Sequence, residues 1–461
     1  MKNFKFNDGF NIYYTVGKSF LMDLCVHFIG VGGVSMSSLA KYLLNAGFTV
    51  QGSDITRSAY TDELIAAGAE IFIGNAAENI KNAQMVVYSD AIKAEDKELV
   101  AARQRGLYVI SRTELLKSVA ENFKTIVGVG GCHGKTTVTC MLAHIFRRAK
   151  LKFTAHIGGE DNEFSNCALF GGEIFLSEVC EYKKNLLAFD CTLAVCLNAD
   201  PDHLDCYKDY DELKNTYYEY IKRADKAIIN IDDGSLAKCG DKNAATFGFS
   251  CGAKYTAKNL VDENGKYRFD FYADGKKACR VKLCVYGRHN VQNALAAAAT
   301  ATELGIKAAD IKRGLADFKG VKRRFENIGE INGAKVIIDY AHHPREIAAV
   351  YAAAKELNSN RIITVFQPHT YSRTIFLKDE FLSVLGRIKN LYIYKTFAAR
   401  ENFTDGGSAF DLYRDLGGET AYFDDFAALK TQLEKTLLSG DLLLVLGAGD
   451  LAEKFRAELS H

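Results

Sequence analysis

The chain has 461 residues and is 48% hydrophobic, which exceeds the needs of one ordinary core, so we expect two or three cores and, most simply, three domains. Its 58 lysines and arginines nearly balance its 57 aspartates and glutamates, and the net charge of +1 argues against a polybasic surface for nucleic acid or for an anionic membrane. No apolar stretch is long enough to span a bilayer, so we expect no membrane insertion.

The cysteines and the N-terminus favour a cytoplasmic location. The 12 cysteines are scattered, with no CxxC pair and no zinc-ligand spacing, so we interpret them as reduced thiols. The apolar stretch that starts at Phe20 is interrupted by Asp23 and His27 before it reaches the length of a secretory signal. Residues 1–21 precede Met22 and the first clear strand, and are interpreted either as a mis-assigned start or as an extension.

The first predicted unit is a strand, a glycine turn and a helix. Cys25–Ile29 is typical of a buried strand, and the next segment has apolar residues at helical spacing from Met36 to Leu44. A second strand, Phe48–Gly52, ends shortly before Asp54. This alternation of strand and helix predicts a parallel sheet.

The glycine turn after the first strand resembles a dinucleotide-binding fingerprint. Gly30, Gly32 and Gly33 would let the backbone approach a diphosphate, and Asp54 follows at a spacing suited to a ribose hydroxyl. Ser35 replaces the third glycine of that fingerprint, so NAD is not specified. A tight turn without a ligand fits the sequence equally well.

A second unit begins with the strand Lys124–Val129, which places a domain boundary near residues 121–123. The strand leads through the loop Gly130–Thr137 into a helix whose apolar face runs from Val138 to Phe146. Backbone N–H groups of such a loop can hold phosphate oxygens, as in GxxxxGK[ST] loops, although valine takes the first glycine position here. An ordinary glycine-rich turn is the alternative.

Polar residues follow two further strands of the second unit. Glu178 and Glu181 come after the strand Glu173–Leu176, and His203 comes after the strand Leu193–Leu197. Ligands of α/β proteins usually bind at this end of parallel strands. A carboxylate and a neutral imidazole there could complete a magnesium site, whereas exposed charge is the alternative.

A third unit follows Gly320, with strands expected at Lys335–Asp339, Arg361–Phe366, Leu391–Tyr394 and Leu442–Leu446. Two of its strand ends, residues 339–344 and 367–373, carry histidines and an arginine that suit a carboxylate or a phosphate. Helix capping is the alternative. Zinc binding by the neighbouring His342 and His343 is not expected, because adjacent residues rarely point in one direction.

These units predict an α/β fold with three domains. We expect a Rossmann-like N-terminal domain at residues 1–122, a central P-loop ATPase-type domain with a mostly parallel sheet at 123–320, and a Rossmann-like C-terminal domain at 321–461. With three prolines and no Ser/Gly-rich tract, the linkers are expected to be short.

Taken in order, the motifs resemble one family, the Mur ligases, which build the peptide of bacterial peptidoglycan. The resemblance covers nearly all of residues 24–461 and is carried by the segments VHFIGVGGVSMSSLAKYLLNAGFTVQGSD, GCHGKTT, NADPDHLDCY, GRHNVQNALAAAA, GVKRRFE, IIDYAHHPREI, FQPHTYSRT and LVLGAGD. It implies an ATP-dependent ligation through an acyl phosphate. The lactyl carboxylate of UDP-N-acetylmuramic acid attacks the γ-phosphate of ATP, and the amine of L-alanine then displaces phosphate.

The resemblance also implies roles for individual residues. The residues expected to be catalytic are Lys135, Glu178, His203 and Arg324. Those expected to bind ATP are Gly131, Cys132, His133, Gly134, Lys135, Thr136, Thr137, Asn290, Asn293, Arg324 and Asp339. Magnesium, or manganese, is expected on Thr136, Glu178 and His203. UDP is expected on Gly30, Gly32, Gly33 and Asp54, and the amino acid on Tyr340, His342 and Arg373. A monomer or a homodimer is expected.

Some positions depart from the family pattern. Cys132 stands where threonine is usual, so we expect activity together with sensitivity to oxidants. Asn75 stands where histidine is common. Glu181 is left without a role, and Lys208 and Lys214 are interpreted as solvated charge.

Three other functions remain open at this stage. An enzyme that recycles a whole wall peptide onto the same sugar nucleotide has similar motifs. A nicotinamide-dependent oxidoreductase would use the first glycine turn but would leave the loop at Lys135 unexplained. A non-catalytic relative is disfavoured by the presence of Lys135, Glu178, His203 and Arg324.

Overall fold

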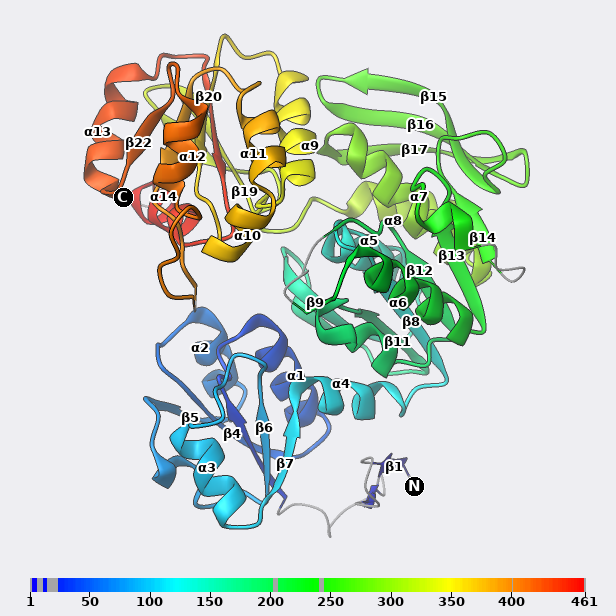
Figure 1. Cartoon of the computed structure of the whole chain (residues 1–461). Coiled ribbons are helices and arrows are strands. Elements are labelled where there is room, and N and C mark those ends of the chain that lie inside the picture. The colour runs from blue at the N-terminus through cyan, green and yellow to red at the C-terminus, as the bar shows by residue number, and fades with distance from the viewer. Residues whose placement is uncertain are drawn as a thin grey trace. The chain divides into compact units, whose positions relative to one another are not determined.

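The chain forms α/β sheets in a computed structural model that describes residues 2–5, 11–14, 24–201, 206–239, 244–399 and 401–459 (Figure 1). It divides into two compact units. The first consists of Met1–Thr256, Ala273–Gly275 and Leu295–Gly314. The second consists of Ala257–Tyr272, Lys276–Ala294 and Leu315–His461. None of the helices in the described ranges is both long and apolar enough to cross a membrane.

A parallel five-stranded sheet in the first unit has the order β5-β4-β3-β6-β7. Its strands are β3 (Cys25–Ile29), β4 (Thr49–Asp54), β5 (Glu70–Ile73), β6 (Met85–Tyr88) and β7 (Tyr108–Ser111). Its helices are α1 (Val34–Asn45), α2 (Ala59–Ala66), the 3₁₀ helix η1 (Ala77–Ile80), α3 (Lys97–Gln104) and α4 (Arg112–Ala120). The short strands β1 (Lys2–Lys5) and β2 (Asn11–Tyr14) form a separate antiparallel pair.

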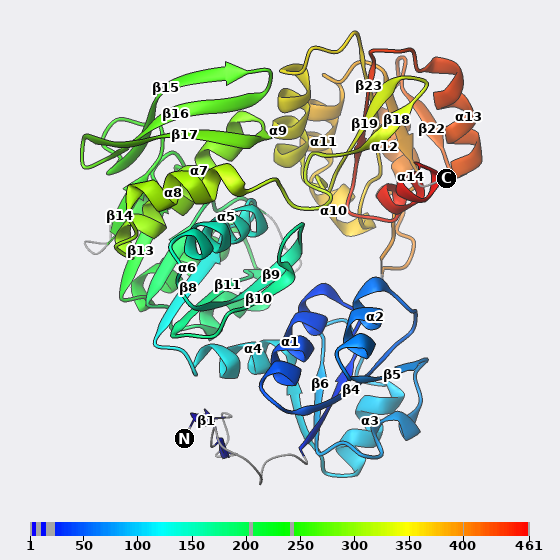
Figure 2. The ribbon, with the colours of Figure 1, turned by 180° about the vertical axis from the view of Figure 1, so that it is seen from behind.

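The central strand β3 is buried on both faces of this sheet. Successive side chains of a strand point to opposite faces. Val26 and Phe28 therefore join a core that includes residues of α1 and α4, while Ile29 packs in a second core with residues of α3. These helices can be followed beside the strands in Figure 2. Burial on both faces explains the run of mainly apolar residues in β3.

A ten-stranded sheet follows, with the order β10-β9-β11-β8-β12-β13-β14-β15-β16-β17. Its middle strands are parallel, and β10 is antiparallel to β9. The strands are β8 (Thr125–Gly130), β9 (Phe153–Asp161), β10 (Ser165–Leu169), β11 (Ile174–Glu178), β12 (Leu193–Cys196), β13 (Lys226–Asn230), β14 (Ala244–Phe247), β15 (Tyr255–Glu263), β16 (Lys266–Ala273) and β17 (Lys276–Tyr286). The helices are α5 (Lys135–Arg148), η2 (Tyr182–Ala188), α6 (Tyr210–Arg223), η3 (Leu236–Cys239), α7 (Arg288–Glu303) and α8 (Ala308–Asp317).

A six-stranded sheet in the second unit has the order β18-β19-β23-β20-β21-β22, with β18 antiparallel and the others parallel. The strands are β18 (Glu326–Ile331), β19 (Ala334–Asp339), β20 (Ile362–Phe366), β21 (Leu391–Tyr394), β22 (Ala421–Phe423) and β23 (Leu442–Leu446). One core joins the sheet to helices α9 (Pro344–Lys355), α11 (Lys378–Leu385) and α12 (Ala409–Leu416). A second core joins it to α13 (Phe426–Thr436) and α14 (Leu451–Leu459), and a short helix α10 spans Tyr371–Phe376.

The expected α/β fold with mostly parallel sheets is confirmed. Every strand expected from its apolar run is present with bounds within about two residues. The expectations from sequence included no strand at the positions of β5 to β7, β9, β10, β13 to β18 or β22. The limits of the three domains at residues 122 and 320 stay a prediction.

Candidate active site

Two glycines shape the loop between β8 and α5. Gly131 has a φ of +141° and Gly134, the N-cap of α5, a φ of +85°, both in the region that favours glycine. A Cβ added to Gly131 would lie 2.9 Å from the Cβ of Leu197. Among the residues that the structure describes, no side chain makes a capping hydrogen bond at the start of α5. The loop can therefore close against the residues after β12 and still direct backbone N–H groups toward an anion.

Lys135, the first residue of α5, folds its ammonium group back into the loop. The ammonium donates hydrogen bonds to the carbonyl groups of Gly131 and Cys132 and lies 3.0 Å from Oε2 of the buried Glu181. Burial alone lowers the pKa of Lys135, but the Glu181 carboxylate and nearby groups outweigh it, so the pKa lies above its ordinary value. Lys135 is therefore positively charged at the point where the loop can receive a phosphate.

Thr136 and Glu178 bring two oxygen ligands together beside the loop. The Thr136 hydroxyl donates to Glu178 Oε2 over 3.0 Å, and Glu178 Oε1 accepts the backbone N–H of Gly158 over 2.5 Å. A Cβ on Gly158 would lie 2.7 Å from Glu178 Oε2, so glycine leaves room for the carboxylate. Hydroxyl and carboxylate oxygens are ligands that Mg²⁺ prefers, and these two residues fit that ion.

The third expected metal ligand, His203, lies outside the described residues. Within the described ranges, no cluster of three or more His, Cys, Asp or Glu side chains is arranged to hold a metal ion. The magnesium site thus stays a prediction that rests on Thr136 and Glu178 among the described residues.

The segment after β12 holds the loop in place. Asn198 accepts the backbone N–H of His133 over 2.8 Å and donates its amide to the His133 carbonyl over 3.0 Å. His133 Nε2 lies 3.2 Å from Asp200 Oδ2. Cys132 Sγ lies 3.1 Å from the carbonyl O of Asp200 and 3.2 Å from its N. The Cys132 thiol therefore makes contacts with Asp200 that a hydroxyl group could also make.

The structure brings the expected sugar-nucleotide residues together at the end of β3 and β4. The backbone N–H of Gly32 donates to Asp54 Oδ2 over 2.8 Å, and Gly30 has a φ of +80°. A Cβ on Gly32 would lie 2.8 Å from the same carboxylate oxygen. Gly33 is the N-cap of α1, and no side chain in the described part of the chain makes a capping hydrogen bond there. One oxygen of Asp54 is thus used to fix the turn.

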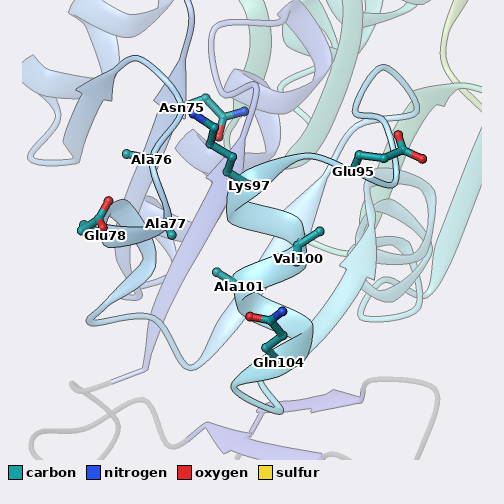
Figure 3. Close-up of a pocket in the computed structure, with 9 residues that line it drawn as sticks. All are labelled: Asn75, Ala76, Ala77, Glu78, Glu95, Lys97, Val100, Ala101 and Gln104. Atoms are coloured by element: carbon teal, nitrogen blue, oxygen red, sulfur yellow. The ribbon is translucent and has the colours of Figure 1, made fainter.

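Asn75, which departs from the family pattern, lies at the same edge of this sheet, because Gly74 N–H bonds to the Asp54 carbonyl over 2.8 Å. The amide of Asn75 donates a hydrogen bond to Asp96. Asn75 also lines an open depression of about 470 Å³ with Glu78, Glu95, Lys97 and Gln104 (Figure 3). Its contact with Asp96 holds its side chain at the rim of this depression.

In the second unit, Asp339 ends β19 and is buried. Its two carboxylate oxygens accept the backbone N–H groups of Phe325 and Ala341 over 2.7 and 2.8 Å. Burial raises the pKa of Asp339 to about 6, and the nearby Glu346 adds to that rise while Arg324 opposes it. Asp339 therefore fixes the backbone at the entrance of the polar segment that follows β19.

Glu346 contacts two residues that are expected near the amino acid or ATP. It lies 3.5 Å from a guanidinium nitrogen of Arg324 and 3.4 Å from Nδ1 of His342. The guanidinium of Arg324 lies 5.2 Å from the centre of the Tyr340 ring, and that of Arg323 lies 4.7 Å from it. The result is a cluster of cationic and aromatic groups that suits a carboxylate or a phosphate.

Arg373 in α10 belongs to the same part of the second unit. Its guanidinium lies 3.2 Å from Nδ1 of His369. The ring of His369 stacks on Phe397, and its centre lies 5.7 Å from that of His342. Arg373 and His342 thus both lie beside His369, and the centre of the Tyr340 ring lies 5.3 Å from that of His342. That these residues bind the amino acid stays a prediction.

Asn290 and Asn293 occupy the first turns of α7. The Asn290 amide donates to the carbonyl of Tyr286 over 2.7 Å, and the Asn293 amide donates to Asn290 Oδ1 over 2.9 Å. Asn290 is buried and Asn293 is partly exposed. The pair therefore orders the start of this helix and leaves Asn293 accessible.

Sequence reasoning missed some residues that hold these groups. Glu181 was left without a role but is the partner of Lys135. Asn198 and Asp200 fix the loop, and Glu346 joins Arg324 to His342. The polar run from Asn198 to Asp200 directly after a buried strand was the available signal for the first pair. Glu346 is also the N3 residue of a capping box, so its second role could not be separated from helix capping.

Three domains of a known protein family match most of the chain. Residues 25–124 match the Mur ligase family catalytic domain, 129–301 the Mur ligase middle domain, and 323–449 the Mur ligase glutamate ligase domain. It is 40% identical over 446 residues to a UDP-N-acetylmuramate–L-alanine ligase of Clostridium beijerinckii, covering 93% of this chain and 96% of that protein. It is 41% identical over 436 residues to the protein of that name in Clostridium novyi, covering 92% and 95%.

Solved structures agree with these matches. The UDP-N-acetylmuramate–alanine ligase of Thermotoga maritima aligns with a TM-score of 0.80 at 26% identity, over 94% of this chain and 98% of that chain. A murein peptide ligase from Psychrobacter arcticus shares the fold with a TM-score of 0.73 at 21% identity, over 95% and 98%. With three family domains matched in order and relatives at 40% identity over nearly the whole length, this chain belongs to the Mur ligase family.

Proposed function

We propose that this enzyme uses ATP to join L-alanine to the lactyl carboxylate of UDP-N-acetylmuramic acid. The observation that carries the proposal is the loop before α5, in which the Lys135 ammonium and the Thr136–Glu178 pair lie side by side. Such an arrangement suits phosphoryl transfer, which depends on positioning and on neutralising charge. The relatives at 40% identity that carry the name of this activity support the choice of substrates.

We assign the first step to the loop and its neighbours. Lys135 neutralises the β- and γ-phosphates of ATP, and the N–H groups at the start of α5 hold their oxygens. Thr136 and Glu178, with His203, would hold Mg²⁺ or Mn²⁺, which supplies charge neutralisation between ATP and the attacking carboxylate. An oxygen of the lactyl carboxylate attacks the γ-phosphorus of ATP, ADP leaves, and an acyl phosphate forms. The alanine amine then attacks the carbonyl carbon, phosphate leaves, and the nitrogen loses a proton as the amide forms.

The remaining residues are assigned to substrates. Gly30, Gly32, Gly33 and Asp54 would bind the UDP moiety. Tyr340, His342 and Arg373 would bind the amino acid, because a guanidinium suits its carboxylate. The ATP assignment covers Gly131, Cys132, His133, Gly134, Thr137, Asn290, Asn293, Arg324 and Asp339. We further propose a cytoplasmic enzyme that acts as a monomer or a homodimer, with domains at residues 1–122, 123–320 and 321–461.

The assay that tests this function measures phosphate release from ATP and Mg²⁺ in the presence of UDP-N-acetylmuramic acid. L-alanine, a wall tripeptide and no acceptor are compared. Release that depends on L-alanine is the expected result. Preference for the tripeptide would indicate an enzyme of wall-peptide recycling. NAD(H) bound to the purified protein would instead support the oxidoreductase function. No phosphate release with either acceptor would contradict the proposal.

A further inference from the structure

A chain of buried and partly buried hydrogen bonds crosses from the glycine-turn helix α1 to the strand that ends at Glu178. His156 of β9 lies at its centre and is 5% exposed. Its Nε2 lies 2.9 Å from Oγ of Ser35, in the first turn of α1. Its Nδ1 lies 3.3 Å from Oγ of Ser177, its neighbour on β11. Neither the assigned substrates nor the assigned metal uses His156.

One assignment of protons satisfies every group in this chain. Arg112 can only donate, and its guanidinium lies 3.3 Å from Ser35 Oγ, so the Ser35 hydroxyl accepts there and donates to His156 Nε2. His156 Nδ1–H then donates to Ser177 Oγ. The Ser177 hydroxyl donates to the carbonyl of Glu178 over 2.9 Å. In this assignment each hydroxyl accepts once and donates once, and the imidazole is neutral.

We propose that His156 is a positioning residue that ties the start of α1 to the end of β11 and so sets how far a sugar nucleotide at the glycine turn reaches toward Glu178. This rests on the proposed function, in which the diphosphate sits at Gly30–Gly33 and the lactyl carboxylate reacts beside Glu178. A displacement of about 1 Å at a reacting centre can cost roughly 100-fold in rate, so the link is expected to matter for that substrate.

A second contact holds α1 independently. The buried Asn166 of β10 donates its amide to the Val34 carbonyl and to Ser37 Oγ, each over 2.7 Å. Removal of the His156 link should therefore leave α1 docked, while its connection to the strand of Glu178 is lost. This separates a positioning effect from general unfolding.

The test compares His156→Leu, Ser35→Ala and the double variant, with His144→Leu as matched control. His144 is also a buried histidine of this sheet's helix α5, bonded to Asp161 over 3.1 Å, and it is not part of the link to α1. For His156→Leu we expect kcat/KM for UDP-N-acetylmuramic acid to fall by about 10- to 100-fold while ADP affinity of the protein alone is unchanged. Thermal unfolding of each variant is measured alongside.

Because Ser35 acts through His156, the two substitutions should remove the same link. We therefore expect kcat/KM for UDP-N-acetylmuramic acid to fall no further in the double variant than in the more impaired single variant. Losses that multiply would overturn the proposal, since Ser35 and His156 would then act separately. The proposal would also be overturned if His156→Leu and His144→Leu had equal kinetic constants. It would likewise be overturned if ADP affinity fell together with kcat/KM for UDP-N-acetylmuramic acid. An unaltered chain without L-alanine-dependent release would instead refute the proposed function.

Discussion

At the scale of single residues, the charge of Lys135 is expected to matter most for turnover. Lys135→Ala removes the ammonium that the loop and Glu181 hold in place. Loss of one preorganised charge at a reacting group typically costs at least about 100-fold in rate, and we expect such a fall in L-alanine-dependent phosphate release. The control is Lys124→Ala, since Lys124 is 79% exposed before β8. Equal activity of the two variants would contradict the ATP assignment.

Cys132 is expected to make the enzyme sensitive to peroxide without being needed for activity. In Cys132→Thr, the hydroxyl can take over the contacts with the backbone of Asp200, so activity close to that of the unaltered chain is expected. The unaltered chain should lose activity in peroxide, because oxidation adds a polar group to a packed loop. The Cys132→Thr variant should keep its activity in peroxide. The control variant Cys251→Ser, which changes an exposed cysteine, should lose activity as the unaltered chain does. Full activity of the unaltered chain after peroxide would rule this out.

His156 is expected to make stability depend on pH. Burial, and then the charge of Arg112, lower the pKa of His156 to about 3 from an ordinary value of 6.5. The folded state therefore binds fewer protons, so the full stability is present above about pH 6.5 and is lost as pH falls toward 3. The loss attributable to this group is about 2 kcal/mol between pH 8 and pH 5. The free energy of unfolding, measured in urea, should depend less on pH in His156→Leu than in the unaltered chain. Equal dependence on pH in the two proteins would contradict this prediction.

At the scale of elements, a buried polar cluster joins α3 to the centre of the first sheet. Glu98 and His27 are both fully buried, and Glu98 Oε2 lies 2.7 Å from His27 Nε2 and 2.6 Å from Ser53 Oγ. Glu98 Oε1 accepts the Asn79 amide over 2.7 Å. Burial raises the pKa of Glu98, but these hydrogen bonds outweigh it, and the pKa lies below its ordinary value. The cluster therefore fixes α3 and η1 against β3 and β4.

Glu98→Ala is expected to destabilise this element strongly. The change leaves the buried donors of His27, Ser53 and Asn79 without their acceptor, and the expected loss is about 3–5 kcal/mol. Urea unfolding followed by circular dichroism measures it. Glu95→Ala is the control, because Glu95 is exposed just before α3. A loss no larger than that of the control would show that the cluster contributes little.

A contact can be predicted from the sequence when the two residues that make it lie close together along the chain. The loop from Gly131 to Lys135 could be predicted because local glycine geometry and helix start determine it. Lys135 and Glu181 are 46 residues apart, and His27 and Glu98 are 71 residues apart, so these pairs depend on how strands are ordered in the sheet. Local patterns do not contain that order, which is why the polar cluster around Glu98 went unnoticed.

At the scale of the whole molecule, the described residues form hydrophobic cores within each of the two units. The core of residues 26–236 lies in the first unit, and the two cores of residues 325–455 lie in the second. We expect more than one transition in scanning calorimetry, because units with separate cores can unfold separately. Glu98→Ala should lower one transition temperature and leave the other in place. A single transition, lowered as a whole by Glu98→Ala, would mean that the units unfold together.

Helix α7 has a consequence for exchanging parts between relatives. Its first half belongs to the second unit and its second half, from Leu295, to the first. The chain thus returns to the first unit as far as Gly314, which packs against Ile145 of α5. A chimera joined at Thr256 would divide the first unit between two parents, because Ala273–Gly275 and Leu295–Gly314 would come from the second parent. One joined at Gly320 would keep the whole first unit from one parent and the six-stranded sheet with its helices from the other, and would divide only the second unit. We therefore expect recombination between relatives to be tolerated better at Gly320 than at Thr256.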